Sequence, residues 1–213
     1  MKLNHDFKGA LLIFNPSFSG TDDSQNKAMV QITRVTNTAE LIGIQTLQAE
    51  NLRKHIDAAE ATSQGFLMAE YSLEFLQSMH NEAPSIIAKD GDKVIGYALV
   101  ATQAVRDEHD LLADLFNTID RTLFEGKLLK GTAYVVVGQL CVSKDYRGQG
   151  LVQQLYGHFR ACLENEYDFC ITDVAQANTR SLKAHKNTGY QVIDTLSYGG
   201  IGWDIVLWDW RKN

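Results

Sequence analysis

Residues 134–156 read YVVVGQLCVSKDYRGQGLVQQLY, and three different patterns follow one another in this stretch. Residues 134–142 are apolar and rich in β-branched side chains, which predicts a buried strand. Residues 143–150 are polar and contain two glycines, which predicts a turn. From Leu151 onward the apolar residues recur at helical spacing, so we expect a helix to follow the turn directly. These apolar positions are 151, 152, 155, 156, 159, 162 and 163.

A strand that leads through a glycine-containing turn into a helix is typical of a phosphate-binding site. The first N–H groups of a helix have no partner inside the helix, and the helix dipole favours negative charge at that end. Gly148 and Gly150 leave these donors uncovered by side chains, and Arg147 adds a positive charge. The stretch therefore predicts binding of a phosphorylated ligand.

Two common phosphate-binding motifs do not fit this stretch. The nucleoside-triphosphate loop requires Gly-x4-Gly-Lys followed by Ser or Thr, and residues 143–152 do not contain it. The dinucleotide motif requires Gly-x-Gly-x-x-Gly, but Gln153 occupies the position of the third glycine. The phosphorylated ligand is thus expected to be something other than a nucleoside triphosphate or a nicotinamide dinucleotide.

The sequence RGQGLV at 147–152 resembles the acetyl-CoA loop of the GNAT superfamily of N-acyltransferases, whose pattern is Arg/Gln-x-x-Gly-x-Gly/Ala. The match covers Arg147 and Gly150, whereas Val152 stands where the family has a small residue. The resemblance implies acetyl-CoA as co-substrate, with its pyrophosphate on this loop and no metal ion. The implied contacts are Arg147, Gly148, Gln149, Gly150, Leu151 and Val152.

Composition sets the class of protein. The chain has 213 residues, of which 45% are hydrophobic and 22% charged, as in a globular domain of ordinary size. No apolar run approaches the roughly 20 residues that span a bilayer, and the start has no signal-peptide core, so we expect a cytoplasmic protein. Three cysteines without metal-ligand spacing predict free thiols. The net charge of −6 argues against nucleic acid and would suit a cationic acceptor.

The expected order of elements is similar to the GNAT fold over residues 30–213. This α/β (α+β) fold has a mixed, mostly antiparallel sheet, a splayed pair of parallel strands, and helices on both faces. Residues 1–29 form an extension of unknown role, for example an edge strand or an arm toward a second subunit, and about 103–131 form a helical insertion. Strands are expected at 29–35, 85–89, 93–102, 134–142, 167–174, 191–196 and 203–210, and further helices at 39–61, 66–80, 151–163 and 179–187.

A second stretch, Asn178-x-x-Ser181-x-x-x-His185-x-x-x-Gly189-Tyr190, resembles the family segment Asn-x-x-Ala/Ser-x-x-x-Tyr-x-x-x-Gly-Phe. From the residues alone, Asn178 is a helix N-cap and Gly189 a helix C-terminal glycine. The resemblance adds a hydrogen bond from Asn178 to pantetheine, and Ser181 as a neighbouring contact. His185 stands where many members have a tyrosine that protonates the thiolate. It is a candidate general acid, or alternatively a structural or CoA-contacting residue.

Acyl transfer to an amine also requires groups that bind the thioester and take up a proton. The backbone of Leu140, Cys141 and Val142 is expected to bind the thioester where the strands splay; the alternative is an ordinary central strand. The sequence assigns no general base: Glu70, Tyr71 and Asp173 are candidates by location only, Asp173 at the end of the strand beside the splay, and the alternative for each is a surface or core-edge residue. Cys141 is near the expected thioester, but a buried, unreactive thiol is favoured over a nucleophile.

The acceptor is expected between residues 61–71, the loop around 197–203 and the insertion. Tyr71, Tyr198 and Trp203 are the candidate acceptor-binding residues, with a mobile aromatic loop and a plain hairpin as alternatives for 198–203. The predicted function is transfer of an acetyl group from acetyl-CoA to a primary amine, borne by a small molecule or a peptide, by direct attack on the thioester. The alternatives are a CoA-binding regulatory module without turnover and a different acyl donor. A homodimer is compatible with this prediction, and neither a nucleic-acid nor a membrane partner is expected.

Overall fold

The computed structural model describes residues 30–55 and 66–211. The N-terminal extension expected at 1–29 lies outside the described residues, as do the predicted end of the first long helix and residues 61–65 of the expected acceptor site. Within the described ranges, no helix combines the length and the apolarity needed to cross a bilayer.

A seven-stranded sheet forms the centre of the molecule, with the strand order β1-β2-β3-β6-β7-β9-β8. All neighbours in it are antiparallel except β6 and β7, which run parallel. This confirms the expected mixed sheet. The strands are β1 Gln31–Arg34, β2 Ile86–Asp90, β3 Lys93–Ala101, β6 Tyr134–Val142, β7 Phe169–Ala175, β8 Gln191–Tyr198 and β9 Ile201–Asp209.

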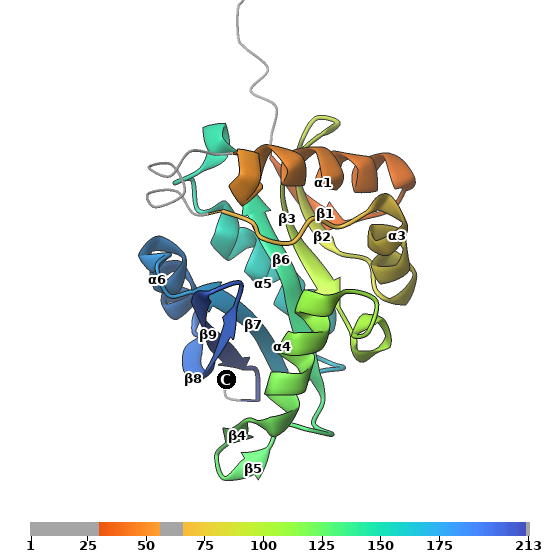
Figure 1. The fold of residues 1–213 in the computed structure, drawn as a ribbon. Coiled ribbons are helices and arrows are strands. Elements are labelled where there is room, and N and C mark those ends of the chain that lie inside the picture. The colour runs from red at the N-terminus through yellow and green to blue at the C-terminus, as the bar shows by residue number, and fades with distance from the viewer. Residues whose placement is uncertain (1–29, 56–65, 212–213) are drawn as a thin grey trace, which may run out of the picture.

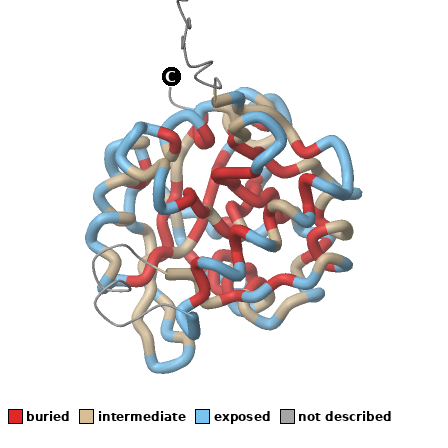
Figure 2. The backbone as a smooth tube through the Cα atoms, turned by 90° about the horizontal axis from the view of Figure 1, so that it is seen from above, coloured by how far each residue is buried: buried red, intermediate tan, exposed pale blue. Residues whose placement is uncertain are grey.

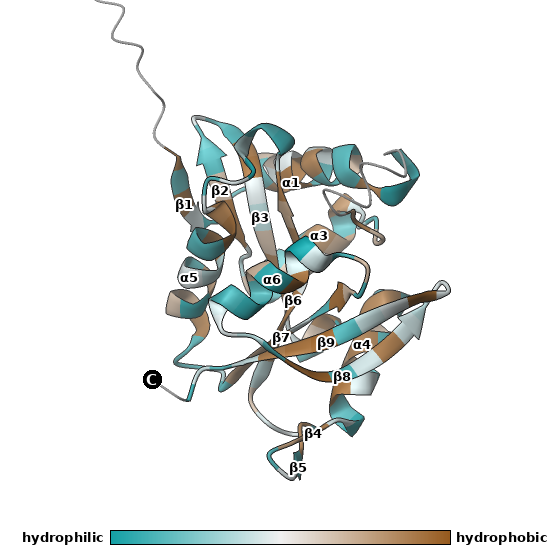
Figure 3. Cartoon of the chain, turned by 90° about the vertical axis from the view of Figure 1, so that its left-hand side faces the viewer, coloured by the Kyte–Doolittle hydropathy of each residue, from teal (hydrophilic) through white to brown (hydrophobic). Residues whose placement is uncertain are grey.

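Helices cover both faces of this sheet, as expected from the sequence (Figure 1). One apolar cluster joins the sheet to α1 (Thr38–Asn51), α3 (Leu73–Glu82) and α4 (Asp110–Arg121). A second cluster joins the opposite face to α5 (Leu151–Leu163) and to the side of α6 (Thr179–Thr188) that carries Leu182. The buried backbone accordingly runs through the middle of the molecule (Figure 2), and the hydrophobic segments follow the central strands (Figure 3). The helices therefore sandwich the sheet.

The parallel strands β6 and β7 are paired over only part of their length. Their register begins at Tyr134 opposite Phe169 and ends at Val136 opposite Ile171. Beyond it, Thr172 Oγ1 still donates to the carbonyl of Val137 at 2.8 Å. The remaining half of β6 stays paired with β3, and the remaining half of β7 with β9, so a gap opens in the sheet. This gap is the expected splay.

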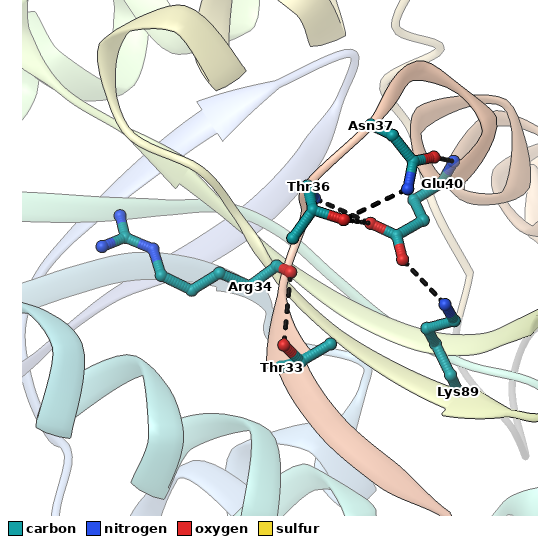
Figure 4. Close-up of polar contacts among 6 residues, drawn as sticks. All are labelled: Thr33, Arg34, Thr36, Asn37, Glu40 and Lys89. Carbon is teal, nitrogen blue, oxygen red and sulfur yellow. Dashed lines mark hydrogen bonds and ion pairs between the residues drawn. The ribbon is translucent and has the colours of Figure 1, made fainter.

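A network of polar side chains fixes the start of α1 (Figure 4). Asn37 Oδ1 accepts from the N–H of Glu40 at 3.1 Å, and Glu40 Oε2 accepts from the N–H of Thr36 at 2.7 Å. Glu40 Oε1 pairs with Lys89 of β2 at 2.8 Å. Burial alone would raise the pKa of Glu40, but these hydrogen bonds outweigh it and lower that pKa. The reciprocal cap attaches α1 to the sheet edge.

Two predicted helices are shorter in the structure. The helix expected at 39–61 ends at Asn51, and the helix expected at 66–80 begins only at Leu73, after the N-cap Ser72. The reason is backbone pairing: the N–H of Leu67 donates to Asn51 O at 3.0 Å, and the N–H of Arg53 donates to Leu67 O at 2.9 Å. Residues 66–71 are therefore extended along the end of α1.

Two hairpins also differ from the prediction. The insertion contains α4, as expected, followed by a small hairpin of β4 (Leu123–Phe124) and β5 (Lys127–Leu128), which the sequence pattern did not predict. The last two strands extend to Tyr198 and Ile201, so only Gly199 and Gly200 connect them. Both have positive φ (57° and 74°), as a two-residue hairpin turn requires. Residues 199 and 200 thus form a tight hairpin turn, and closure of the aromatic residues Tyr198 and Trp203 over an acceptor stays a prediction.

Candidate active site

The turn between β6 and α5 forms an open cradle at a helix N-terminus. Gly148 and Gly150 have φ of 80° and 76°, a conformation that side-chain-bearing residues rarely adopt. A Cβ atom at either position would meet no atom within 4 Å, so the space in front of the turn is open. Because Gly150 is the N-cap of α5, the first N–H groups of that helix face this space. The cradle suits an anionic group such as a pyrophosphate.

The guanidinium group of Arg147 spans the base of this cradle. Its Nε donates to the carbonyl of Val142 at 3.1 Å, and one Nη donates to Asn51 Oδ1 at 2.6 Å. The other Nη is buried and has no partner among the described residues. A buried charged donor without a partner is costly, so this nitrogen fits a site that an anionic ligand completes. The structure thus supports the expected charge at this loop.

The cavity beside the cradle, called here the loop-side cavity, reaches from the loop to the gap between β6 and β7. The expected cofactor residues gather around it, because strand β6, the loop and the first turns of α6 converge there. Its wall is formed by Asn51, Phe66, Leu67, Leu140, Cys141, Val142, Arg147, Val152, Asn178, Arg180, Ser181, Ala184 and His185. The space in front of the loop adds Gly148, Gly150 and Leu151 to these residues. Gln149 is exposed, and its side chain donates to Asp145 O at 3.2 Å instead.

Backbone donors of β6 face the gap. The N–H of Ser143 donates to Ile95 O of β3 at 2.7 Å, whereas Val142 O accepts from Arg147 on the opposite side. Because peptide groups alternate in direction along a strand, Leu140 and Val142 present their N–H groups to the gap. The N–H of Cys141 points toward β3 instead. Two of the three expected backbone positions therefore offer donors to a ligand.

The second motif lies on α6, as expected. Asn178 is its N-cap: Oδ1 accepts from the N–H of Ser181 at 3.1 Å. His185 is buried, with 4% of its surface exposed. Its Nδ1 lies 2.8 Å from Ser181 O, and its Nε2 lies 2.7 Å from the hydroxyl of Tyr156. Since a carbonyl only accepts, Nδ1 carries the proton and Nε2 accepts from Tyr156. Burial lowers the pKa of His185, so the ring is neutral and both nitrogens are engaged.

A second cavity, called here the α4-side cavity, adjoins the first at the gap. The two share wall residues at the end of the extended segment, on β6 and on α6, namely Phe66, Leu67, Leu140, Asn178, Ser181 and His185. The α4-side cavity continues along Met68, Ala69, Tyr71, Leu111, Leu112, Leu115, Gly138, Gln139, Thr172, Asp173, Val174, Ala175 and Trp203. The insertion helix α4 therefore forms part of the site, and a ligand in one cavity can reach a ligand in the other.

Asp173 is the acidic residue of the α4-side cavity. It lies on β7 opposite Ile205, beyond the point where β7 leaves β6. Burial raises the pKa of Asp173 to about 6. Burial, together with the charge of Asp173, raises the pKa of Tyr71, whose hydroxyl donates to Gly138 O at 3.2 Å. Asp173 is therefore ionised near neutral pH, yet basic enough to accept a proton.

A buried amide network shapes β6 at the gap. Gln139 Nε2 donates to Ala69 O at 3.0 Å, and its Oε1 accepts from Gln48 Nε2 at 3.0 Å and from Tyr97 Oη at 2.6 Å. The register between β3 and β6 shifts here, because Leu99 pairs with Gln139 while Val100 pairs with Val137. Gly138 is the extra residue of this bulge. The bulge turns β6 at the point where the two cavities meet.

Other candidate residues occupy different places. Glu70 is exposed and pairs with Lys54, away from both cavities. Burial raises the pKa of the Cys141 thiol to about 12, so this buried cysteine is not an activated nucleophile. Trp203 lines the α4-side cavity at the start of β9. Tyr198 is half-buried at the end of β8 and belongs to neither cavity wall.

Sequence reasoning missed several residues that line or support the two cavities. Asn51 ends α1 and holds Arg147, and Arg180 lies two residues beyond Asn178 and borders the loop. Gln48 and Gln139 are 91 residues apart in the chain and meet only through tertiary packing. The available signal for this pair was a polar residue, Gln48, on the buried face of α1, and this signal does not identify the residue that Gln48 binds.

Comparisons with known proteins agree with this geometry. Residues 52–190 match the model of the Acetyltransferase (GNAT) family. No curated protein sequence matches the chain. Among solved structures, a GNAT-family acetyltransferase from Streptococcus agalactiae has a TM-score of 0.59 at 15% identity, covering 84% of this chain and 95% of that one. Arabidopsis thaliana NAA60, in complex with acetyl-CoA, has a TM-score of 0.58 at 16% identity, covering 85% and 99%.

A third solved structure is the ribosomal-protein-S18-alanine N-acetyltransferase from Escherichia coli, with a TM-score of 0.57 at 13% identity, covering 85% of this chain and 94% of that one. At these identities the solved structures show a common fold. The family match spans the loop, the gap and the helix α6, so it includes most of the elements that build both cavities, whereas Asn51 of α1 and Trp203 of β9 lie outside it.

Proposed function

This chain belongs to the acetyltransferase (GNAT) family, and we propose that it transfers an acetyl group from acetyl-CoA to a primary amine. The amine nitrogen forms the new bond to the acetyl carbonyl carbon, the bond from that carbon to sulfur breaks, and CoA leaves as its thiolate. The amine gives up a proton to a base of the protein. We propose residues 30–213 as the unit that carries this activity.

The observation that carries the proposal is the junction of the two cavities at the gap between β6 and β7. The loop-side cavity begins at an anion cradle and leads inward along β6. The α4-side cavity approaches the same residues of β6 from the other side and contains a carboxylate. A thioester reaching the gap from one side would therefore meet an amine arriving from the other.

Acetyl-CoA supplies an acetyl group activated as a thioester, and the residues of the loop-side cavity fit this co-substrate. Gly148, Gly150 and the N-terminus of α5 would hold its pyrophosphate, with the unpartnered Nη of Arg147 adding a charged donor. The N–H groups of Leu140 and Val142 would bind along the gap and polarise the carbonyl. Asn178 has an amide N–H2 in the same wall, available while its oxygen caps α6.

Asp173 is the residue we assign as general base. It lies in the wall of the cavity that would hold the amine, and its raised pKa of about 6 suits proton uptake near neutral pH. We assign His185 a positioning role, because its two ring nitrogens are used by Ser181 and Tyr156. The thiolate of CoA has an ordinary thiol pKa near 8.5 and can leave without a dedicated acid.

The experiment that tests this function measures thiol release from acetyl-CoA in the presence of a panel of primary amines, with mass detection of the acetylated amine. We expect stoichiometric thiol and acetylated amine. Binding of acetyl-CoA without release across the panel would contradict catalysis and indicate a CoA-binding module. Propionyl-CoA and longer acyl donors in the same assay define the acyl group.

A further inference from the structure

We propose that the acceptor is a small primary amine carried by an apolar body, such as an alkylamine or an arylalkylamine, and that helix α4 selects it. This inference rests on the proposed function, since it names the substrate of the same site. It concerns the α4-side cavity, whose wall determines what can accompany the amine nitrogen.

The wall opposite the gap is apolar and comes from the insertion. Leu111, Leu112 and Leu115 line it from α4, and Met68 and Trp203 continue it from the extended segment and from β9. Leu112 and Leu115 are held in place by the core, with 2% and 3% of their surfaces exposed. An apolar wall of fixed position favours an acceptor that presents hydrocarbon to it.

Asp173 is the one residue of this wall, as far as the described residues form it, that carries a charge near neutral pH. A single carboxylate complements one ammonium group. It does not match a polyamine, whose second ammonium group would be buried without a partner, and it repels the carboxylate of a free amino acid. The charge pattern therefore specifies a monoamine without an adjacent acid group.

Most of the remaining polar side chains in the wall are already used by the protein; the exceptions are the indole N–H of Trp203, which is buried without a partner among the described residues, and the amide N–H2 of Asn178, which is assigned to acetyl-CoA. The hydroxyl of Tyr71 donates to Gly138 O, that of Thr172 donates to Val137 O, and the amide of Gln139 is bound to Ala69, Gln48 and Tyr97. Backbone groups of residues 66–71 are also hydrogen-bonded within the protein, since the N–H of Tyr71 donates to the side-chain oxygen of Gln48. A peptide acceptor brings several amide groups, of which one carbonyl could accept from the Trp203 N–H, and each amide group left unpaired costs binding. This favours a small amine over a peptide N-terminus.

The test compares kcat/KM of the full-length protein with acetyl-CoA for n-propylamine through n-hexylamine, 2-phenylethylamine, phenylalanine, spermidine and a tripeptide that begins with phenylalanine. We expect kcat/KM to rise about fourfold per methylene, the equivalent of about 0.8 kcal/mol for each buried CH₂, until the cavity is filled. Phenylalanine differs from 2-phenylethylamine only by its carboxylate and should be at least about a hundredfold poorer.

Variants on α4 test whether this helix determines which amine is accepted. Leu111→Ala should lower kcat/KM for n-hexylamine by about 5- to 20-fold and leave that for n-propylamine within about twofold. Asp114→Ala, on the exposed side of the same helix, is the matched control and should leave both values unchanged. A flat alkylamine series, or faster acetylation of the tripeptide, phenylalanine or spermidine, would overturn this inference while leaving the proposed acetyl transfer intact. Absence of acetyl transfer to every amine would overturn the proposed function itself.

Discussion

The hydroxyl of Tyr156 lies 2.7 Å from Nε2 of His185, deep in the packing between α5 and α6. Nδ1 of the same ring lies 2.8 Å from a main-chain carbonyl, so the ring donates on one side and accepts on the other. The rings of Tyr190 and Tyr156 pack against the imidazole, with centroids 5.1 Å and 5.4 Å away. This arrangement makes His185 a member of a polar and aromatic cluster that holds α6 beside the gap.

The first prediction follows from this cluster. Replacing His185 by Phe leaves the buried hydroxyl of Tyr156 without its acceptor, so we expect a loss of about 1–3 kcal/mol in the free energy of unfolding. Denaturant unfolding measures this loss, and the double variant with Tyr156→Phe should recover part of it. We expect kcat to stay within about threefold and its pH profile to keep its shape. A loss of tenfold or more in kcat at unchanged stability would instead establish His185 as the general acid.

The second prediction concerns catalysis by Asp173. If it is the general base, Asp173→Asn should lower kcat by about 10²- to 10⁴-fold and leave the affinity for acetyl-CoA unchanged. For the native protein, kcat/KM should rise with pH through about 6, the raised pKa of this carboxyl, because only the ionised form accepts a proton. Steady-state rates between pH 5 and 8 check both points. If Asp173→Asn keeps both its activity and the rise of kcat/KM with pH, Asp173 is not the general base.

The third prediction concerns stability at the same position. The folded pKa of Asp173 lies above the ordinary value of 3.8, so the folded state holds a proton that the unfolded state releases. Ionisation of this buried carboxyl therefore lowers the free energy of unfolding. This loss of stability is absent below pH 4, grows between pH 4 and 6, and is complete above pH 6. Asp173→Asn removes it and should stabilise the protein at pH 7 by about 1–3 kcal/mol. Thermal unfolding at pH 4 and pH 7 measures the difference; equal effects at the two pH values would contradict it.

The fourth prediction concerns Arg147. Its buried, unpartnered Nη should donate to a phosphate oxygen, and hydrogen bonds between charged groups are worth about 1.5–3 kcal/mol. Arg147→Met should therefore weaken acetyl-CoA binding by about 10- to 150-fold in calorimetry and reduce its dependence on salt. Lys93→Met removes the same charge from an exposed site at the start of β3 and serves as the control. Equal affinities for the two variants would remove Arg147 from the site.

Much of the fold could be predicted because local patterns and the final structure agree. The predicted bounds of β6 are those of the structure, since a β-branched run ends where a polar turn begins. The cap at Asn178 and the start of α5 were also correct, because capping and helix periodicity act over a few residues. The parallel pair with its splay was confirmed, although it came from the family resemblance rather than from periodicity.

The parts that failed depend on contacts distant in sequence. Helical spacing from Phe66 onward was misleading, because backbone pairing with the end of α1 makes residues 66–71 extended. The second ring nitrogen of His185 is bound by Tyr156, which is 29 residues away, so spacing from Asn178 could not show that both ring nitrogens are used. The role of α4 as a cavity wall likewise required the three-dimensional structure. Local patterns therefore identified the cradle, whereas the acceptor side depended on tertiary packing.

The central claim, that acetyl-CoA binds at the turn before α5, is tested most directly by its effect on thermal stability in a pair of matched variants. Gly150 and Gly126 have φ of 76° and 79°, and a Cβ atom at either meets no atom within 4 Å. A glutamate at either position therefore introduces the same charge and a similar strain, but only Gly150 faces the cradle. The hairpin turn at Gly126 lies between β4 and β5, away from both cavities.

At a hundredfold excess over its dissociation constant, acetyl-CoA should stabilise the native protein by about 2.7 kcal/mol and raise its melting temperature by about 5–10 °C. We predict that Gly126→Glu retains this rise and that Gly150→Glu abolishes it. Equal rises in the two variants, or no rise in the native protein at millimolar acetyl-CoA, would contradict the account.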